Sequence, residues 1–384
     1  MNALLLCHEY PPAGGGAGWA AHQIARHMGA AGHGVTLLTA RHVLRPAPPP
    51  GLPYRLVEVG RPQRSASGGN LRAWLDFMLA GSRAALALAN AARPDVALAF
   101  FTLPAGAAAA TLRARRGVPF AVSLRGADVP GFFPDEYRRF HLPAAWAIRA
   151  IWRRAAVLVA NSAGLRDLAL RAGAPVVAVV PNGVDGDLFR PPARPPAPDP
   201  VTVLSVGRFA AQKNNAGLLR AAAEATRKIA RPFRLELVGD GPERESLGAL
   251  AGGLGLADRV TFLPWQPRET LVARYQSAHL FVLASHDEGM PNAVLEAMAC
   301  GLPIVGTRVG GTEELVTDGD NGILVPPGDD AALAGALAAL VENDGLRARM
   351  GARSLARTGG HGWTGVASAY ADLLARAARG AAGR

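Results

Sequence analysis

The chain has 384 residues, and its 41 Lys and Arg residues against 30 Asp and Glu residues give a formal net charge of +11. Hydrophobic residues make up 49% of the sequence and charged residues 18%, which excludes a disordered chain, and its 45 Gly and 30 Pro lack the three-residue period of collagen. The sequence therefore describes a globular protein, with a length that suggests about two or three domains.

Short apolar runs alternate with amphipathic segments along the first half of the chain, which is typical of βαβ units and a parallel sheet. The segment FRPPARPPAPDP at 189–200 is too rich in proline to form a helix or a central strand. We therefore predict a first domain at 1–188 and a linker at 189–200. Strands of the first domain are expected at 3–7, 35–39, 54–59, 96–101, 120–124, 157–160 and 176–180.

The same alternation resumes after the linker and predicts a second doubly wound α/β domain at 201–360. A helical tail, rich in Ala, Leu and Arg, follows at 361–384 and could pack back on the first domain. In doubly wound sheets, ligands bind where loops leave the carboxyl ends of strands. The strands of the second domain are expected at 201–206, 234–238, 260–263, 280–284, 303–307 and 322–325.

Two loops of the first half carry candidate binding residues. Gly15 and Gly16 precede a predicted helix, whose N–H groups and dipole favour an anion, but their spacing fits neither G-x-G-x-x-G nor a P-loop, and a flexible turn is the alternative. In the segment 123–131, Asp128 could orient a hydroxyl and Arg125 could meet a phosphate or a sugar. A local pair between these two side chains would fit equally well.

Two loops of the second half carry further candidates. Arg208 and Lys213, one of only two lysines in the protein, follow an expected strand and would suit a diphosphate, or could form a solvated pair of charges. Glu288 precedes a short helix predicted within 291–301, and Glu296 lies inside it, in apolar surroundings where a carboxylate needs partners. These carboxylates could hold separate hydroxyls of an elongated ligand, or could each bond to the backbone.

Several function classes lack their usual sequence features. Two cysteines are too few for a disulfide framework, and no His/Cys cluster indicates zinc. The first residues lack the pattern of a signal peptide, and the longest uncharged run, 96–112, contains Pro104 and Gly106. Aromatic residues make up 6%, and no nucleic-acid-binding motif is present. We therefore predict a cytoplasmic chain with no membrane span, no metal and no nucleic-acid partner.

Positive charge is concentrated in the first half of the chain. Residues 1–190 hold 21 Arg and 10 acidic residues, a net charge of +11, whereas residues 191–384 hold 20 basic and 20 acidic residues. This excess suits an anionic membrane surface or a phosphorylated acceptor. The segment WAIRAIWRR at 146–154 could lie on such a membrane or pack as an ordinary helix.

A set of motifs resembles, in the same order along the chain, those of family 4 glycosyltransferases. The motifs are YPPAGGGAG at 10–18, PNGVD at 181–185, VGRFAAQKN at 206–214, VGDGP at 238–242, EGMPNAVLEAMACGLPIVGTRVGGTEELV at 288–316 with its Glu-x7-Glu pair, and NGILVPPGD at 321–329. The resemblance implies the GT-B fold, in which two Rossmann-like domains face a cleft. It also implies sugar transfer from a nucleotide donor with retention of the anomeric configuration, without a metal or a cofactor.

The resemblance assigns roles to residues of the second half by position. Arg208 and Lys213 would bind the donor diphosphate and stabilise its charge as the glycosidic bond breaks. Glu296 would hold the ribose hydroxyls. Glu288 and the backbone of Gly289 and Met290 would meet the transferred sugar.

The resemblance assigns the first domain to the acceptor. Gly15 or Gly16 would approach the diphosphate or the acceptor, and Asp128 would engage the acceptor. Many members have His-Gly-x-Asp where this chain has Arg125-Gly-Ala-Asp128, so the resemblance assigns to this chain no role that needs a neutral imidazole near the sugar. The residues expected to act in catalysis are Arg208, Lys213, Glu288 and Asp128.

The sequence thus predicts a retaining, metal-independent glycosyltransferase that uses a UDP- or GDP-sugar. Its acceptor would be a glycan or a lipid-linked molecule in the synthesis of a surface polysaccharide or glycolipid. The first domain would rest peripherally on the anionic inner face of the membrane. The alternatives are a sugar phosphorylase or synthase of the same fold that acts on soluble sugars, and a non-catalytic protein that binds sugar nucleotides.

Overall fold

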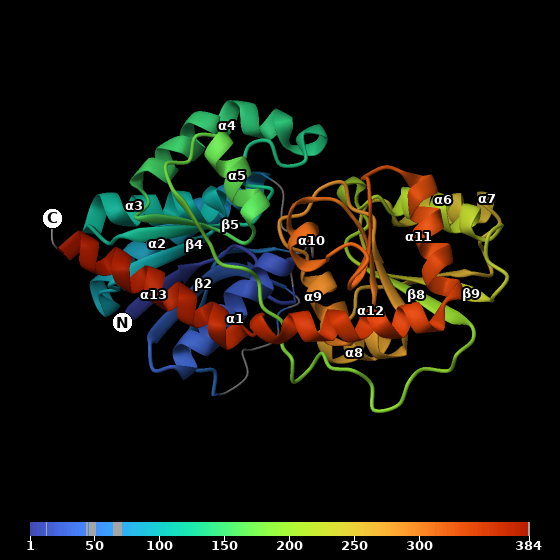
Figure 1. Ribbon diagram of the computed structural model, residues 1–384. Coiled ribbons are helices and arrows are strands. Elements are labelled where there is room, and N and C mark those ends of the chain that lie inside the picture. Colours follow the sequence, from blue (N-terminus) through green and yellow to red (C-terminus); the bar gives the residue numbers. More distant parts are fainter. Residues whose placement is uncertain (13, 44, 46–50, 64–70, 383–384) are drawn as a thin grey trace. The chain divides into compact units, whose positions relative to one another are not determined.

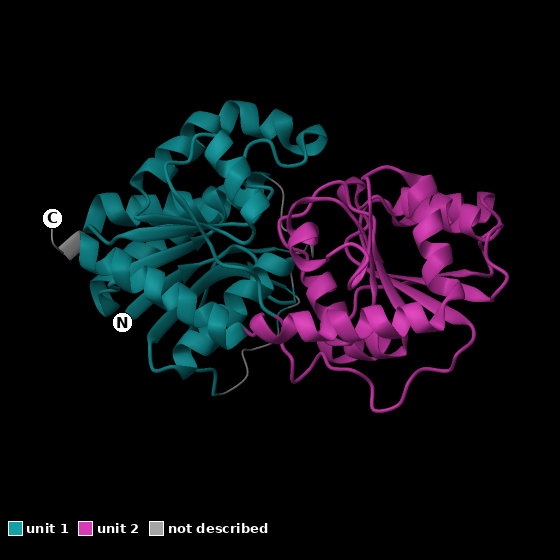
Figure 2. Ribbon diagram, viewed as in Figure 1, with its two compact units in different colours: residues 1–183, 363–384 teal, residues 184–362 magenta. Residues whose placement is uncertain are grey.

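The computed structural model describes residues 1–12, 14–43, 45, 51–63 and 71–382 of the chain (Figure 1). The chain divides into two compact units: unit 1, formed by Met1–Gly183 and Trp363–Arg384, and unit 2, formed by Val184–Gly362 (Figure 2). The Pro-rich segment 189–200 belongs to unit 2, and the last helix of the chain belongs to unit 1.

Unit 1 contains a sheet of seven parallel strands in the order β3-β2-β1-β4-β5-β6-β7. Helices cover both of its faces, which is why its central strands consist almost entirely of apolar residues. The strands are β1 Asn2–Leu6, β2 Gly34–His42, β3 Arg55–Gln63, β4 Val96–Phe100, β5 Phe120–Leu124, β6 Val157–Ala160 and β7 Val177–Val179. The helices are α1 Gly16–Ala30, α2 Leu71–Ala92, α3 Ala107–Arg116, α4 Pro134–Arg154, α5 Ala163–Arg171 and α13 Trp363–Ala382, with an irregular turn η1 at Phe101–Gly106.

Unit 2 contains a sheet of six parallel strands in the order β10-β9-β8-β11-β12-β13. Two apolar clusters, one on each face, hold the helices against it. The strands are β8 Val201–Val206, β9 Phe233–Val238, β10 Val260–Leu263, β11 Leu280–Leu283, β12 Ile304–Thr307 and β13 Gly322–Val325. The helices are α6 Asn215–Ala225, α7 Arg244–Gly253, α8 Arg268–Ser277, α9 Asn292–Ala299, α10 Gly310–Leu315, α11 Asp330–Glu342 and α12 Asp344–Arg357.

Every strand expected from the sequence overlaps a strand of the structure, and both sheets are parallel. The predicted α/β class with two doubly wound sheets is therefore confirmed. Because all strands of a sheet run in one direction, the loops that leave their carboxyl ends meet at one edge. In each unit, the candidate residues are carried by loops or helices that follow these carboxyl ends.

Helix α13 completes the core of unit 1, where it lies beside α1 (Figure 1). Trp363, Tyr370 and Leu374 are buried in the same apolar cluster as Leu5 of β1. The hydroxyl groups of Tyr370 and Ser123, which is in β5, are hydrogen-bonded at 2.8 Å. One face of the unit 1 sheet is thus covered by residues that lie at opposite ends of the sequence.

Replacing Leu374 by alanine should lower the free energy of unfolding of unit 1 by about 2–5 kcal/mol, because the substitution leaves a cavity in a fully buried site. Urea denaturation followed by circular dichroism measures this loss. Leu170→Ala, on the exposed side of α5, is the matched control and should cost less than about 1 kcal/mol. Equal losses in the two variants would contradict a core role for α13.

Candidate functional site

A buried ion pair lies at the carboxyl ends of β8 and β11, which are neighbours in the unit 2 sheet. The Lys213 ammonium donates a hydrogen bond to Oε1 of Glu288, and the Ser285 hydroxyl donates to the same oxygen at 2.6 Å. Only 20% of the Lys213 side chain and 7% of the Glu288 side chain are exposed. These hydrogen bonds compensate for the hydration that both charges lose on burial.

Hydrogen bonds between loops hold this ion pair in place. The Gln212 side chain donates to the Asp287 carbonyl at 2.8 Å, and the His286 N–H donates to the Gln212 carbonyl at 2.8 Å. Asn214, with a left-handed φ of +49°, caps α6 by accepting from the Gly217 N–H at 3.1 Å. The lysine therefore projects from a backbone that is fixed on both sides.

Two glycines allow the backbones around the ion pair to approach each other closely. A Cβ at Gly239 would lie 1.9 Å from the Gly207 carbonyl oxygen, and a Cβ at Gly311 would lie 2.0 Å from the Gly289 carbonyl oxygen. Met290, which follows Gly289 in the chain, is buried in the unit 2 core. Side chains at Gly239 or Gly311 would displace the loops that carry the candidate residues.

Arg208 lies in the loop after β8, and its side chain is exposed. In the part of the chain that the structure describes, no carboxylate lies within 4.0 Å of this guanidinium. The arginine therefore differs from Lys213, whose charge is paired. It is the more available of the two predicted cations for an anionic ligand.

Glu296 lies in α9 in a second buried cluster of unit 2. Its Oε1 accepts from the Arg268 guanidinium, and its Oε2 accepts from the Tyr275 hydroxyl at 2.9 Å. Burial, and then the charge of Glu296, raise the pKa of Tyr275, so the phenol stays a neutral donor. Phe189 packs against Tyr275, with ring centroids 5.6 Å apart. The Arg268 guanidinium lies over the Phe189 ring. The sequence predicted the carboxylate but neither of its partners.

Asp128 of unit 1 turns inward and is only 5% exposed. Its Oδ2 accepts from the Thr102 N–H at 2.8 Å and from the Thr102 hydroxyl at 3.1 Å, and its Oδ1 accepts from the Arg125 N–H at 2.8 Å. Trp152 of α4 donates to the Thr102 hydroxyl at 2.8 Å. Burial raises the pKa of Asp128, and the hydrogen bonds from Arg125 and Thr102 oppose the shift. In the structure this carboxylate ties the loop after β5 to the turn after β4.

In the glycine-rich loop after β1, a backbone N–H group already binds the side chain of Glu9, a residue of the same loop. Gly15 precedes α1, and its N–H donates to the Glu9 carboxylate at 3.0 Å, while Gly16 is the first residue of the helix. A Cβ at Gly14 would lie 2.6 Å from Cβ of Glu9. The Glu9 carboxylate thus accepts a hydrogen bond from a backbone N–H group that the sequence predicted would bind an anionic ligand.

Other candidate chemistry is restricted by burial. Cys7 and Cys300 are free and buried, and burial raises the pKa of both thiols, that of Cys300 to about 12. Within the described ranges, no group of three or more His, Cys, Asp or Glu residues could hold a metal ion. None of the described helices combines the length and the apolar character needed to span a bilayer.

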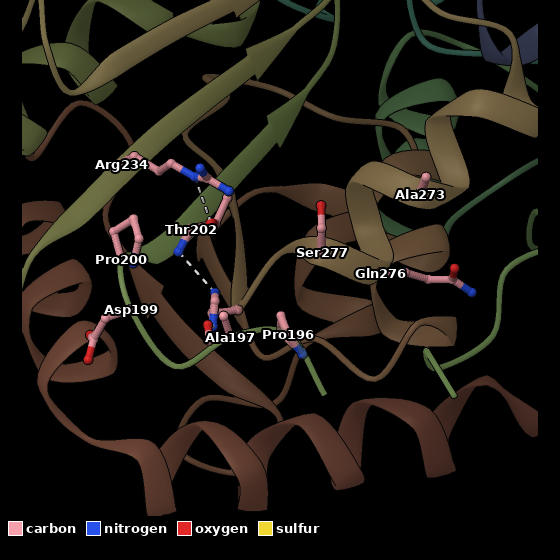
Figure 3. Close-up of a pocket in the computed structure, with 10 residues that line it drawn as sticks. Pro196, Ala197, Asp199, Pro200, Thr202, Arg234, Ala273, Gln276 and Ser277 are labelled. Atoms are coloured by element: carbon pink, nitrogen blue, oxygen red, sulfur yellow. Dashed lines mark hydrogen bonds between the residues drawn. The ribbon is translucent and has the colours of Figure 1, made fainter. Parts of the chain in front are cut away.

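A hollow of about 340 Å³ lies at the opposite, amino-terminal edge of the unit 2 sheet (Figure 3). The Thr202 N–H donates to His279 Nδ1 at 3.0 Å, the other ring nitrogen lies 2.9 Å from the Ala197 carbonyl, and Arg234 donates to the Thr202 hydroxyl at 2.9 Å. These contacts fasten the Pro-rich segment to β8 and β9. The hollow contains none of the predicted site residues.

Each unit is an α/β fold with a fully parallel sheet, and its candidate binding residues follow the carboxyl ends of the strands. This arrangement is typical of nucleotide-binding proteins. The family model described as "Glycosyl transferase 4-like domain" matches residues 15–183, and that described as "Glycosyl transferases group 1" matches residues 190–357. The chain therefore belongs to the family 4 glycosyltransferases, as its motifs predicted.

Similar proteins have related names. A D-inositol 3-phosphate glycosyltransferase of Acidothermus cellulolyticus is 39% identical over 219 residues, 52% of this chain and 48% of that protein. The lipopolysaccharide core biosynthesis glycosyltransferase LpsE of Rhizobium meliloti is 37% identical over 183 residues, 47% of this chain and 51% of that protein. The matches thus span about half the length of these curated relatives.

A solved structure shows the same fold over nearly the whole length of the chain. Anabaena HepE, in complex with UDP and glucose, matches with a TM-score of 0.77 at 21% identity, covering 98% of this chain and 100% of that one. The fold is therefore GT-B, as the motifs implied.

Proposed function

We propose that the chain is a retaining, metal-independent glycosyltransferase that moves a sugar from a UDP- or GDP-sugar to a glycan or lipid-linked acceptor in the synthesis of a surface polysaccharide or glycolipid. The name of LpsE supports a lipid-linked product, and the UDP bound to HepE supports a uridine donor. The reaction takes place in the cytoplasm. It needs no resident cofactor, because the nucleotide sugar is a substrate.

The observation that carries this proposal is the pair of cations in the loop after β8. Arg208 is exposed and Lys213 is held by Glu288, so the loop presents one free and one oriented positive charge. A nucleoside diphosphate gains negative charge when its bond to the sugar breaks, and fixed cations stabilise that charge. The backbone of Gly289 and Met290, next to Glu288, would meet the transferred sugar.

The surroundings of Glu288 favour a positioning role over covalent catalysis. One of its oxygens accepts from both Lys213 and Ser285, which withdraws charge from the carboxylate and makes it a poor nucleophile. The acceptor hydroxyl would instead attack from the side of the leaving diphosphate, whose oxygen takes the hydroxyl proton. Configuration at the anomeric carbon is then retained without a covalent intermediate.

Incubation of the protein with UDP- and GDP-sugars and candidate acceptors, with EDTA present, tests the proposal directly. We expect a product whose anomeric configuration, read by NMR, equals that of the donor. An inverted product, or activity that requires a divalent metal, would contradict it. Dependence on free phosphate or on soluble sugars alone would favour a phosphorylase or synthase, and nucleotide-sugar binding without transfer or hydrolysis would favour a non-catalytic protein.

We further propose that unit 1 rests on an anionic membrane. Unit 1 holds 23 basic and 9 acidic residues, a net charge of +14, whereas unit 2 holds 18 and 21, a net charge of −3. In α4, Trp152 is buried, but Leu142 and Trp146, one turn apart, are 68% and 74% exposed. The exposed Arg138 and Arg149 flank them at helical spacing. A helix face on which arginines flank exposed apolar side chains suits a lipid interface.

Vesicles that contain phosphatidylglycerol should retain the protein at low salt, and replacing Leu142 and Trp146 by serine should reduce the retained fraction about tenfold or more. Sedimentation with sucrose-loaded vesicles measures this. The matched control is a double replacement of Leu170 and Leu355, which are exposed elsewhere, by serine. Failure of these vesicles to bind the wild-type protein would refute the membrane proposal and leave the transferase proposal intact.

A further inference from the structure

The side chain of Arg125 has an incomplete set of partners in unit 1. It leaves the end of β5 with its Nη1 donating to the Asn182 amide oxygen at 2.7 Å and its guanidinium carbon 4.9 Å from the centroid of the Phe100 ring. The Nε and Nη2 atoms are buried, and among the described residues neither has a hydrogen-bond acceptor. Stacking and one hydrogen bond therefore fix the plane of the guanidinium, while two donors are left over.

The charge of Arg125 also lacks a counter-ion. Asp128, three residues away, bonds to the backbone N–H of Arg125 and to Thr102, not to the guanidinium. No carboxylate lies within 4.0 Å of this guanidinium in the described part of the chain, and Asn182 is neutral. A buried donor without an acceptor costs free energy, and a cation without a counter-ion adds to the cost. An anion that reaches these atoms would remove both costs.

The two free donors are arranged for an oxyanion. The N–H bonds of Nε and Nη2 lie on the same side of a guanidinium, and this fork matches the two oxygens of a carboxylate or phosphate. The histidine that many family members have at this position offers one donor at most when neutral, and none of this fork. Arg125 as a residue is half-buried, although its Nε and Nη2 atoms are themselves buried.

We propose that Arg125 binds a carboxylate or phosphate group carried by one of the two sugar substrates, and so selects an acidic sugar. This inference rests on the proposed function, because it assumes that sugar substrates reach the carboxyl edge of the unit 1 sheet. Asn182 and Phe100 act as positioning residues that hold the guanidinium in plane. The acidic group has two possible sources, the transferred sugar of the donor and the acceptor.

Calorimetric titration of the full chain distinguishes these sources in two arms. The donor arm compares UDP-glucose with UDP-glucuronic acid, and GDP-mannose with GDP-mannuronic acid. The acceptor arm compares glucose with glucose 6-phosphate, with and without UDP or GDP. We expect the acidic sugar to bind about tenfold or more tightly than the neutral one in one arm, a typical gain for a charge-assisted bidentate pair.

The preference should fall to within about twofold in Arg125→Gln and be partly kept in Arg125→Lys, which retains the charge without the fork. Arg113→Gln, an exposed arginine of α3, is the matched control and should keep the full preference. Thermal denaturation checks that the variants are folded. If Arg125→Gln is not folded, the preference is compared between the wild-type protein and Arg125→Lys.

Two results would overturn the proposal: equal affinity for acidic and neutral sugars in both arms, or a preference that survives in Arg125→Gln. Failure of the proposed function would give a different result from failure of the Arg125 proposal, because neither UDP nor GDP would then bind to the wild-type protein. The arm with glucose 6-phosphate alone still tests Arg125 in that case.

Discussion

Replacing Lys213 by alanine should lower kcat for sugar transfer about 10²- to 10³-fold, with a smaller change in KM for the donor. The ammonium is fixed by Glu288 before the substrate binds, so its charge is in place when negative charge grows on the leaving diphosphate. Removing a fixed charge that acts mainly in the transition state lowers kcat more than it weakens ground-state binding. Initial rates over a range of donor concentrations separate the two effects.

The matched control is Lys228→Ala, because Lys228 is the only other lysine of the chain. It pairs with Glu224 on the exposed surface of α6 and the turn after it, so its loss should leave kcat within about twofold and cost at most about 0.5 kcal/mol of stability. A kcat for Lys213→Ala equal to that of Lys228→Ala would refute the assignment of the diphosphate site.

The Lys213 variant needs a check on folding. Without the ammonium, the carboxylate of Glu288 stays buried, and Ser285 is its one remaining side-chain partner among the described residues; losing one member of a typical buried pair costs about 3–5 kcal/mol. The double variant Lys213→Ala/Glu288→Gln removes that stranded charge. It should regain stability but not kcat, which separates a loss of catalysis from a loss of structure.

Replacing Glu296 by glutamine should raise KM for the donor about 10- to 100-fold and change kcat only a few-fold. An ionised carboxylate has about four acceptor positions, and Arg268 and Tyr275 each take one, so positions remain for two ribose hydroxyls. Hydrogen bonds from a substrate to a charged group are worth about 1.5–3 kcal/mol, and a ribose far from the reacting bond contributes equally to ground-state and transition-state binding.

A donor with 2′-deoxyribose identifies which contact is lost. The wild-type protein should discriminate against it, and Glu296→Gln should bind the ribose and deoxyribose donors with similar KM values. Glu269→Gln, an exposed glutamate in the first turn of α8, should behave as wild type. If Glu296→Gln kept full discrimination, the carboxylate would serve only to hold Arg268 and Tyr275.

The fold could be predicted because its signals are local. Each buried parallel strand is a short apolar run, and each is bounded by turn residues or by the Pro-rich segment. The candidate carboxylates and cations could be predicted for a similar reason, since they stand in loops after strands or in a motif of known order. Position along the chain was sufficient to select Arg208, Lys213 and Glu288 as candidates.

The partners of these residues could not be predicted, because they depend on which strands are neighbours. Lys213 and Glu288 are 75 residues apart and meet only because β8 and β11 are adjacent. Arg268 and Tyr275 lie on one helix at a spacing of seven, which indicates a shared face but not the carboxylate that the face meets. The inward turn of Asp128 likewise depends on the turn that carries Thr102.

The path of the chain through the two units bears on the order in which the protein folds during synthesis. Unit 2 is one continuous stretch, whereas α13, which covers one face of the unit 1 sheet, is translated after all of unit 2. Domains that emerge first from the ribosome usually fold first. Here unit 1 emerges first, but the apolar side chains of α1, β4 and β5 that α13 contacts stay uncovered until residues 363–382 have been made. A ribosome that stalls within unit 2 would therefore leave an incomplete unit 1 with exposed apolar surface, which chaperones would have to shield.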